Sequence, residues 1–384
     1  MDTSFPEVLD STRSAALRCA YAGFHEHFYG SGFFTLADHF DATVLPLDPP
    51  ADHLAGPLTV HLEVTGNCNL ACRHCFAGGT GLRGELLTID ELDRLFADMA
   101  AIGSFRVGLT GGEPLLRADL LDIIDTAIGH GLSPCLTTNG LLIDDAIAAE
   151  LGNRRLAWLN VSLDGATPET HDHVRGRGTF ARVLDRLAVL RRYAPFSLAF
   201  TVMRHNLHEI CACAALARAV GARAAVFRPL YPVGTARFHE DLLPDFEQYN
   251  QALAGLATFA PTASADFCDA HPFGPEPRRQ TQSVIFAHFG CGAANSVCSV
   301  SASGEVSPCS FLGPDFVGGT LRRQSLSEIW NHSPVFRKMR SMTTPPRCER
   351  CTEFSVCGGG CRARALALRR SIEAPDPWCA AMAG

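Results

Sequence analysis

Short runs of apolar and β-branched residues alternate with longer amphipathic stretches between residues 57 and 230. The runs predict six strands: VHLEVT (60–65), FRVGLT (105–110), PCLTTN (134–139), WLNVSL (158–163), SLAFTVM (197–203) and RAAVFRP (223–229). The stretches between them have the helical period, and strands that alternate with helices form a parallel sheet with right-handed crossovers. Six such units predict an α/β fold, a partial (β/α)6 barrel of TIM type rather than a closed eight-unit barrel.

Helices are expected between these strands near residues 88–103, 118–130, 143–152, 179–193 and 207–220. The first has the clearest boundaries. Thr88 is a good N-cap and Glu91, three residues later, completes a capping box, while Gly103 is a typical stop signal.

The rest of the chain has a different composition. We expect four segments: an N-terminal extension (1–56), the barrel (57–230), a Pro-rich connecting region (231–290) and a small Cys-rich domain (291–384). Within the connecting region, one helix is expected near residues 244–258. The last segment has little apolar pattern, so bound metal clusters would have to stabilise it.

Composition and charge exclude several classes of protein. Hydrophobic residues make up 47% of the 384, enough for a sizeable core, and the net charge of −7 offers no field that attracts nucleic acid. The N-terminus lacks a signal-peptide pattern and no apolar run reaches 18 residues, so we expect no membrane span and a cytoplasmic location.

Sixteen cysteines are many for such a chain. Disulfides are rare in the cytosol, so metal ligation is the natural explanation. Cys68, Cys72 and Cys75 have the spacing C-x3-C-x2-C directly after the first predicted strand. Three thiolates on one loop can hold three irons of a [4Fe–4S] cluster and leave the fourth iron open to a small molecule. Zinc, which usually takes four ligands in two pairs, is the alternative.

This motif resembles the signature of the radical S-adenosylmethionine (SAM) superfamily. The resemblance implies that SAM binds the open iron and is cleaved to a 5′-deoxyadenosyl radical, which abstracts a hydrogen atom from the substrate. It also implies a set of SAM contacts at the ends of the later strands. These are Gly111, Gly112, Glu113 and Pro114 in TGGEP, Asn139 in TTNG, Ser162 in SLDG and, further on, Arg175. An alternative role for Asp164 is to cap the loop that follows it.

A second motif contains eight cysteines: Cys291, Cys298, Cys309, Cys348, Cys351, Cys357, Cys361 and Cys379. Eight thiolates suit two fully ligated [4Fe–4S] clusters, and two zinc sites are the alternative. The pattern is similar to the SPASM extension of radical SAM enzymes that modify peptides. That resemblance assigns Cys291, Cys298, Cys309 and Cys361 to a first auxiliary cluster, and Cys348, Cys351, Cys357 and Cys379 to a second.

Full ligation favours electron transfer, with a purely structural role as the alternative. The leading hypothesis is an oxidoreductase that modifies a ribosomal precursor peptide, similar to the maturases of pyrroloquinoline quinone and mycofactocin precursors. Ser310 stands where the sulfatase-maturing branch has an aspartate base. The expected partners are the substrate and an electron donor such as flavodoxin or ferredoxin. Residues 1–56 are too few for a whole winged-helix domain, so a peptide substrate either needs a separate leader-peptide-binding protein or binds without one.

Two further hypotheses remain. One is dehydrogenation or epimerisation of a sugar-like or other natural-product intermediate, for which Cys268 is the candidate hydrogen donor. The other is a zinc-stabilised binding protein without catalytic activity.

Overall fold

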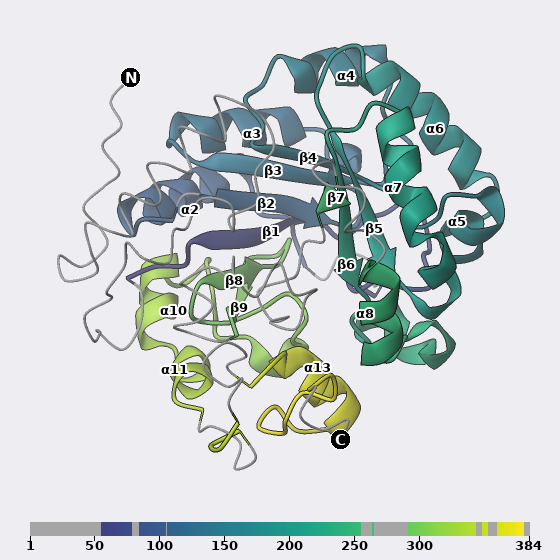
Figure 1. Ribbon diagram of the computed structural model, residues 1–384. Coiled ribbons are helices and arrows are strands. Elements are labelled where there is room, and N and C mark those ends of the chain that lie inside the picture. The colour runs from purple at the N-terminus through teal and green to yellow at the C-terminus, as the bar shows by residue number, and fades with distance from the viewer. Residues whose placement is uncertain are drawn as a thin grey trace, which may run out of the picture.

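The computed structural model describes residues 55–78, 84–104, 106–254, 263–264, 291–342, 348–351 and 359–379. Ten strands of this part form one sheet in the order β10-β9-β8-β1-β2-β3-β4-β5-β6-β7 (Figure 1). The sheet does not close on itself, which confirms the partial barrel.

The six predicted strands are all present: β1 (Thr59–Thr65), β2 (Arg106–Gly111), β3 (Ser133–Thr138), β4 (Trp158–Ser162), β5 (Ser197–Val202) and β6 (Ala224–Pro229). They pair in parallel and in sequence order. The predicted helices are α2 (Ile89–Ala101), α3 (Leu120–Gly129), α4 (Asp145–Gly152), α6 (Thr179–Leu190) and α7 (Ile210–Ala219). The capping box of Thr88 and Glu91 starts α2 as expected.

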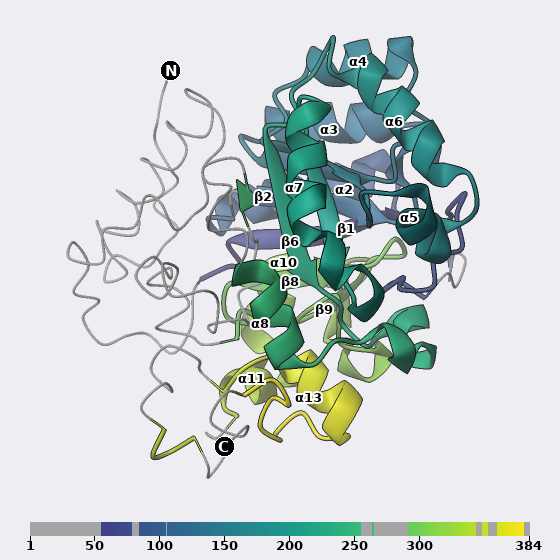
Figure 2. The same ribbon diagram turned by 45° about the vertical axis from the view of Figure 1, so that its right-hand side comes forward.

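The alternation along β1 explains how the sheet is covered. Val60, Leu62 and Val64 are fully buried, whereas His61 and Glu63 between them point to the other face. Helices α2 to α7 lie along one side of the sheet, and Figure 2 shows α6 and α7 packed outside its strands. The apolar positions therefore face this helical layer, and the other face looks into the barrel.

The Cys-rich segment continues the barrel sheet. Strand β8 (Val297–Val300) pairs in parallel with β1, and β9 (Glu305–Ser307) and β10 (Gly319–Thr320) follow antiparallel. On the opposite edge, β7 (Ala263–Ser264) pairs with β6. The boundaries expected at 57, 231 and 291 stay predictions, although this pairing joins the segments into one sheet.

The described part also contains the α-helices α5 (Pro168–Arg175), α8 (Phe246–Ala254), α10 (Leu326–His332), α11 (Pro334–Arg340) and α13 (Arg362–Arg369). Of these, α5 was not expected in the barrel, and it carries Arg175. None of the described helices is long and apolar enough to cross a membrane.

Candidate functional site

The first cysteine loop follows β1 directly. Cys75 donates its backbone N–H to the Cys72 carbonyl at 3.3 Å, so the loop folds into a tight turn. The Cys75 thiol raises the pKa of Cys68, and the thiols of Cys75 and Cys68 both raise the pKa of Cys72, so the three thiols lie close together. Burial raises the pKa of Cys72 to about 11, and the nearby guanidinium of Arg175 opposes that rise.

Glycines pack the end of β2 against this loop. The Gly112 N–H donates to the Thr65 carbonyl at 2.7 Å, and the Glu113 N–H donates to the Asn67 carbonyl at 2.7 Å. A Cβ atom on Gly112 would collide with the Asn67 carbonyl. Gly111 and Gly112 therefore allow the backbone after β2 to contact the backbone after β1. The SAM contact expected from the sequence did not include this packing role.

Glu113 is held at the junction of β2 and β3. Its carboxylate accepts hydrogen bonds from Thr138 Oγ1 at 2.6 Å, Asn139 N at 2.7 Å and Leu115 N at 3.1 Å. Burial raises the pKa of Glu113, and these donors oppose the rise. The Asn139 side chain also donates to Asn69 Oδ1 at 2.7 Å, which ties the end of β3 to the cysteine loop.

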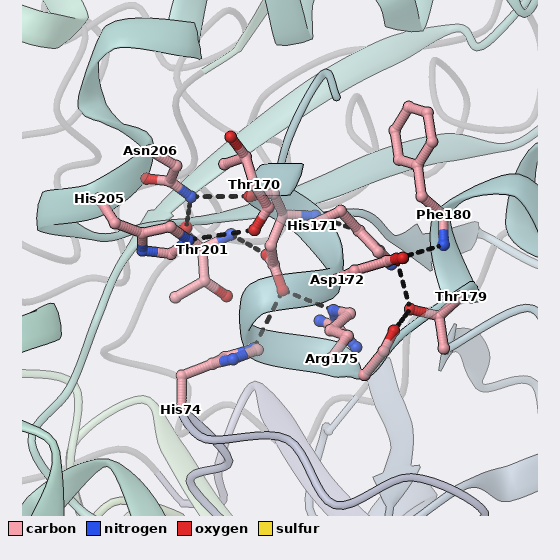
Figure 3. A network of polar contacts seen from close by, with 12 residues as sticks. His74, Thr170, His171, Asp172, Arg175, Thr179, Phe180, Thr201, His205 and Asn206 are labelled. Carbon is pink, nitrogen blue, oxygen red and sulfur yellow. Dashed lines mark hydrogen bonds and ion pairs between the residues drawn. The ribbon is translucent and has the colours of Figure 1, made fainter. Parts of the chain in front are cut away.

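Asp164 is fully buried and belongs to a network of polar contacts. Its partners in this network, which Figure 3 labels, are His74, His171, Arg175, Thr201 and Asn206. Its side chain accepts Arg175 Nε at 2.5 Å and Thr201 N at 2.7 Å, and His74 Nε2 lies 3.0 Å from it. Burial alone would raise the pKa of Asp164, but Arg175 and His74 together hold it well below its usual range. Asp164 is therefore a buried carboxylate with two basic partners, and it forms the centre of a group of ion pairs. The role considered from the sequence was only to cap the loop that follows it.

The backbone of Asp164 is fixed as well. Its N–H donates to His171 Nδ1 at 3.1 Å, and its carbonyl accepts Asn206 Nδ2 at 3.0 Å. Burial lowers the pKa of His171 to about 4, so the ring is neutral near pH 7. The sequence motifs gave no signal for His171 or Asn206, because these residues meet Asp164 only in the folded chain.

The structure also places the predicted SAM contacts Ser162 and Pro114. Ser162 is half-buried at the carboxyl end of β4, and Pro114 is buried at the start of the short helix η3 (Pro114–Leu116).

Cysteines of the second motif also approach one another. Burial raises the pKa of Cys348, and the nearby thiols of Cys379 and Cys351 raise it further, so three of the four thiols assigned to the second auxiliary cluster lie together. Cys357, the fourth, lies outside the described residues, as does Cys268. Cys361 caps α13, where its Sγ accepts the Arg364 N–H at 3.4 Å.

In the described part of the chain, no three His, Cys, Asp or Glu side chains lie close enough to hold one metal ion. The fit to iron–sulfur clusters rests instead on the donor set, namely three thiols on one loop beside Arg175 and a second thiol group near the C-terminus. In a cubane cluster each thiolate binds a different iron, so the ligands need not converge on one point.

Two family models match the chain: the radical SAM superfamily over residues 62–217 and an iron–sulfur cluster-binding (SPASM) domain over residues 291–352. An AdoMet-dependent heme synthase of Methanosarcina barkeri is 34% identical over 339 residues, which cover 84% of this chain and 96% of the relative. The chain belongs to the radical SAM superfamily.

Other relatives of this radical SAM enzyme carry names from peptide maturation. Mycofactocin maturase MftC of Mycobacterium ulcerans is 32% identical, with coverage of 85% of this chain and 88% of the relative. The solved structure of Streptococcus suis SuiB bound to its precursor peptide SuiA has a TM-score of 0.71, 16% identity and coverage of 86% and 77%. At that identity, the solved structure shows the fold alone.

An aromatic cluster of Phe76, Phe311 and Tyr231 joins the two cysteine regions of the radical SAM enzyme. Phe76 follows Cys75, and its ring meets the Phe311 ring edge-on with centroids 5.4 Å apart. Phe311 stacks on Tyr231 at 4.1 Å. Because Phe311 lies two residues after Cys309, the cluster packs the Cys309 loop against the first cysteine loop.

Proposed function

We propose that this chain is a radical SAM oxidoreductase that abstracts a hydrogen atom from a peptide substrate and oxidises it. The observation that carries the proposal is the group of Cys68, Cys72 and Cys75, which lie together beside Arg175 at the carboxyl end of β1. When bound, a [4Fe–4S] cluster and SAM supply one-electron cleavage of SAM and a 5′-deoxyadenosyl radical.

In this proposal, separate groups of residues bind the first cluster, bind SAM and position the SAM-binding residues. Cys68, Cys72 and Cys75 hold the first cluster. Glu113 and Arg175 bind the amino and carboxylate groups of SAM, with Gly111, Gly112, Pro114, Asn139 and Ser162 forming the rest of the SAM site. Asp164 keeps the guanidinium of Arg175 in place and, through His74, the cysteine loop, because Arg175 and His74 both contact its buried carboxylate.

The auxiliary cysteines would hold two more clusters, which would supply a path for electrons away from the substrate. A flavodoxin or ferredoxin supplies electrons in the cytoplasm, and a separate protein presents the leader peptide. Support for a peptide comes from the relatives named for mycofactocin maturation and for cyclisation of the PqqA peptide.

A second candidate is the oxidation of a small molecule. The relatives named heme synthase are as similar to this chain as the maturases are. In this case the substrate is a non-peptide intermediate, and Cys268 is available as a hydrogen donor if the reaction is an epimerisation.

The test is anaerobic purification followed by incubation with SAM and dithionite. We expect about twelve irons and about twelve sulfides per chain and formation of 5′-deoxyadenosine. A variant with Cys68, Cys72 and Cys75 all changed to Ala is the control, which should keep about eight irons and form no 5′-deoxyadenosine. Four or fewer irons with bound zinc in the natural chain would refute the proposal.

The substrate class is tested in the same reaction. A precursor peptide encoded beside the gene should change mass and increase 5′-deoxyadenosine formation. If only small-molecule intermediates do so, the second candidate is correct.

A further inference from the structure

His61 lies on the barrel face of β1. It alternates with Val60 and Leu62, which are fully buried on the side of the helices, so its half-buried imidazole points into the barrel. Because β1 ends at the first cysteine loop, His61 lies on the strand that leads directly to the proposed SAM cluster. Its imidazole is a basic group inside the barrel that neither the first cluster nor SAM requires.

The loop that follows Cys309 contacts this imidazole. Ser310 Oγ lies 3.4 Å from Nδ1 of His61. Phe311, the next residue, meets the ring of Phe76 in the first cysteine loop, with centroids 5.4 Å apart. His61 therefore lies where the first cysteine loop and the Cys309 loop approach each other. A substrate that passes a hydrogen atom to one of these loops and an electron to the other has to bind in this region.

Gly108 leaves space beside the imidazole. The register pairs His61 with Gly108 of β2 and with Ser299 of β8, so the three residues lie at one level of the sheet. A Cβ atom on Gly108 would lie 3.5 Å from Cδ2 of His61, and its only other neighbour within 4 Å among the described residues would be the Val60 carbonyl. The imidazole therefore leans over Gly108, and the absent side chain leaves room for a substrate group next to it.

The contact with Ser310 suits a ring that accepts a proton. When Nδ1 carries the hydrogen and donates it to Ser310 Oγ, the lone pair of the neutral imidazole is on Nε2. A neutral imidazole is the side chain that most often serves as a general base near pH 7. His61 and Ser310 together therefore have the arrangement of a base and the group that orients it.

We propose that His61 is the general base of the oxidation, acting on the substrate through Nε2, and that Ser310 is the positioning residue that orients the ring. The inference rests on the proposed function and names the group that takes the proton. The oxidised first auxiliary cluster takes the electron.

The oxidation balances as one hydrogen atom, one proton and one electron. A substrate carbon loses a hydrogen atom to the 5′-deoxyadenosyl radical, which becomes 5′-deoxyadenosine. Nε2 of His61 then takes the proton of an N–H or O–H group on that carbon, while the electron passes to the auxiliary cluster. The carbon gains a double bond to the nitrogen or oxygen. The reacting carbon of the substrate therefore bears a nitrogen or an oxygen, as every α-carbon of a peptide does.

The role of His61 is tested with His61→Gln and the precursor peptide encoded beside the gene. The variant should keep the iron content of the natural chain and form 5′-deoxyadenosine. Its yield of oxidised peptide should fall about a hundredfold, the lower end of what a general base contributes. His130→Gln is the matched control, because His130 in the helical layer contacts Asp93 on the surface at 2.8 Å. Equal yields of oxidised peptide from the two variants would overturn the inference.

Added imidazole separates a proton acceptor from a structural role. His61→Gly lacks the ring, so imidazole in the buffer should restore oxidised peptide in this variant and leave the natural chain unchanged. Ser310→Ala should lower the yield about tenfold, the contribution of one hydrogen bond, whereas Ser310→Thr keeps the hydroxyl group and should keep the yield. If imidazole does not restore the yield of a folded, iron-loaded His61→Gly, the role of His61 is structural and the inference is refuted.

Glu63 is the competing base on the same face of β1. It lies closer to the first cysteine loop than His61 does, and burial raises its pKa, with Glu305 raising it further. A carboxylate with a raised pKa can also take a proton, so Glu63→Gln is compared with His61→Gln. Loss of oxidised peptide in Glu63→Gln alone would identify Glu63 as the base in place of His61.

Chemical labelling tests contact with the substrate without any turnover. Diethyl pyrocarbonate acylates imidazole nitrogens, and the cluster-loaded natural chain is labelled anaerobically with and without the precursor peptide. Saturating peptide should slow the labelling of His61 severalfold and leave that of His130 unchanged. Equal labelling of His61 in both samples would show that it does not meet the substrate, and the inference would be wrong.

These outcomes are separate from failure of the proposed function, which is seen in the natural chain itself. If the natural chain forms no 5′-deoxyadenosine or leaves the peptide unchanged, the proposed function fails before any variant is compared. If the natural chain oxidises the peptide and His61→Gln does so equally well, the function stands and the inference fails.

Discussion

At the scale of single residues, the buried carboxylate of Asp164 orients the cation beside the cysteine loop. Arg175 uses Nε to bind Asp164, and it also interacts with Cys72 and Cys75. A fixed guanidinium loses little entropy when it binds a second carboxylate. The predicted SAM contact of Arg175 therefore depends on Asp164, which is a positioning residue.

Asp164→Asn should weaken SAM binding by about ten- to a hundredfold, because a charge-assisted hydrogen bond contributes about 1.5–3 kcal/mol. Equilibrium binding of SAM to the cluster-loaded protein measures the effect. Asp172→Asn is the control, because Asp172 lies in α5, the helix that carries Arg175, but its carboxylate accepts the Phe180 N–H at 2.8 Å. Equal SAM affinity in the natural chain and Asp164→Asn would contradict this role.

His171 makes the fold sensitive to acid. Burial lowers the pKa of His171 from 6.5 to about 4 in the folded chain. Below pH 6.5 the unfolded chain therefore binds more protons than the folded chain, and the free energy of unfolding decreases as the pH falls to about 4. Between pH 7 and pH 5 the loss is about 2 kcal/mol. Urea unfolding of His171→Gln at both pH values should show a smaller loss than the natural chain, and an identical loss would rule out this contribution.

At the scale of elements, the site depends on close contact between consecutive loops. The loop after β2 reaches the loop after β1 only because Gly112 has no side chain. The loop after β3 is joined to both through Glu113 and Asn139. These contacts make the carboxyl ends of three strands one unit.

Gly112→Ala should therefore displace the cysteine loop and reduce iron bound in the first cluster, since the new Cβ would collide with the Asn67 carbonyl. Gly129→Ala in α3 is the matched control. Its Cβ would meet nothing within 4 Å, and alanine favours a helix by about 1 kcal/mol. Full iron occupancy and SAM cleavage in Gly112→Ala would show that the loop tolerates the displacement.

At the scale of the whole molecule, a buried ion pair joins the C-terminal turns. Arg364 donates through Nε to Asp376 Oδ1 at 2.6 Å, and Asp376 also accepts the backbone N–H of Cys361 at 2.6 Å and of Trp378 at 3.0 Å. Arg364 also lies over the Trp378 ring at 4.3 Å. One carboxylate thus ties the cysteine that begins α13 to the residue before Cys379.

Arg364→Leu should destabilise this region by about 3–5 kcal/mol, because it leaves the Asp376 charge buried without its partner. The exposed ion pair of Arg322 with Glu91 is the comparison, and Arg322→Leu should cost less than about 1 kcal/mol. Thermal unfolding and iron content check both variants. Similar midpoints for the two would indicate that the Arg364 pair contributes little.

Much of the fold and of the first site could be predicted from local patterns. A short run of apolar and β-branched residues indicated β1, and the capping box indicated the start of α2. Helix α5 was missed because its mean polarity is high and its few buried residues give a weak apolar pattern. The partners of Asp164 were missed because Thr201 and His171 approach it from other elements.

Cys68, Cys72 and Cys75 are neighbours along the chain, so their spacing alone was enough to place them on one loop and to indicate a cluster. His61 is different. Its place within the run that forms β1 gave no sign of chemistry, and Ser310, the residue that it contacts, lies 249 residues further along the chain. Only the tertiary structure decided that these two side chains meet inside the barrel, because the pairing of β8 with β1, and not spacing along the chain, brings their segments together.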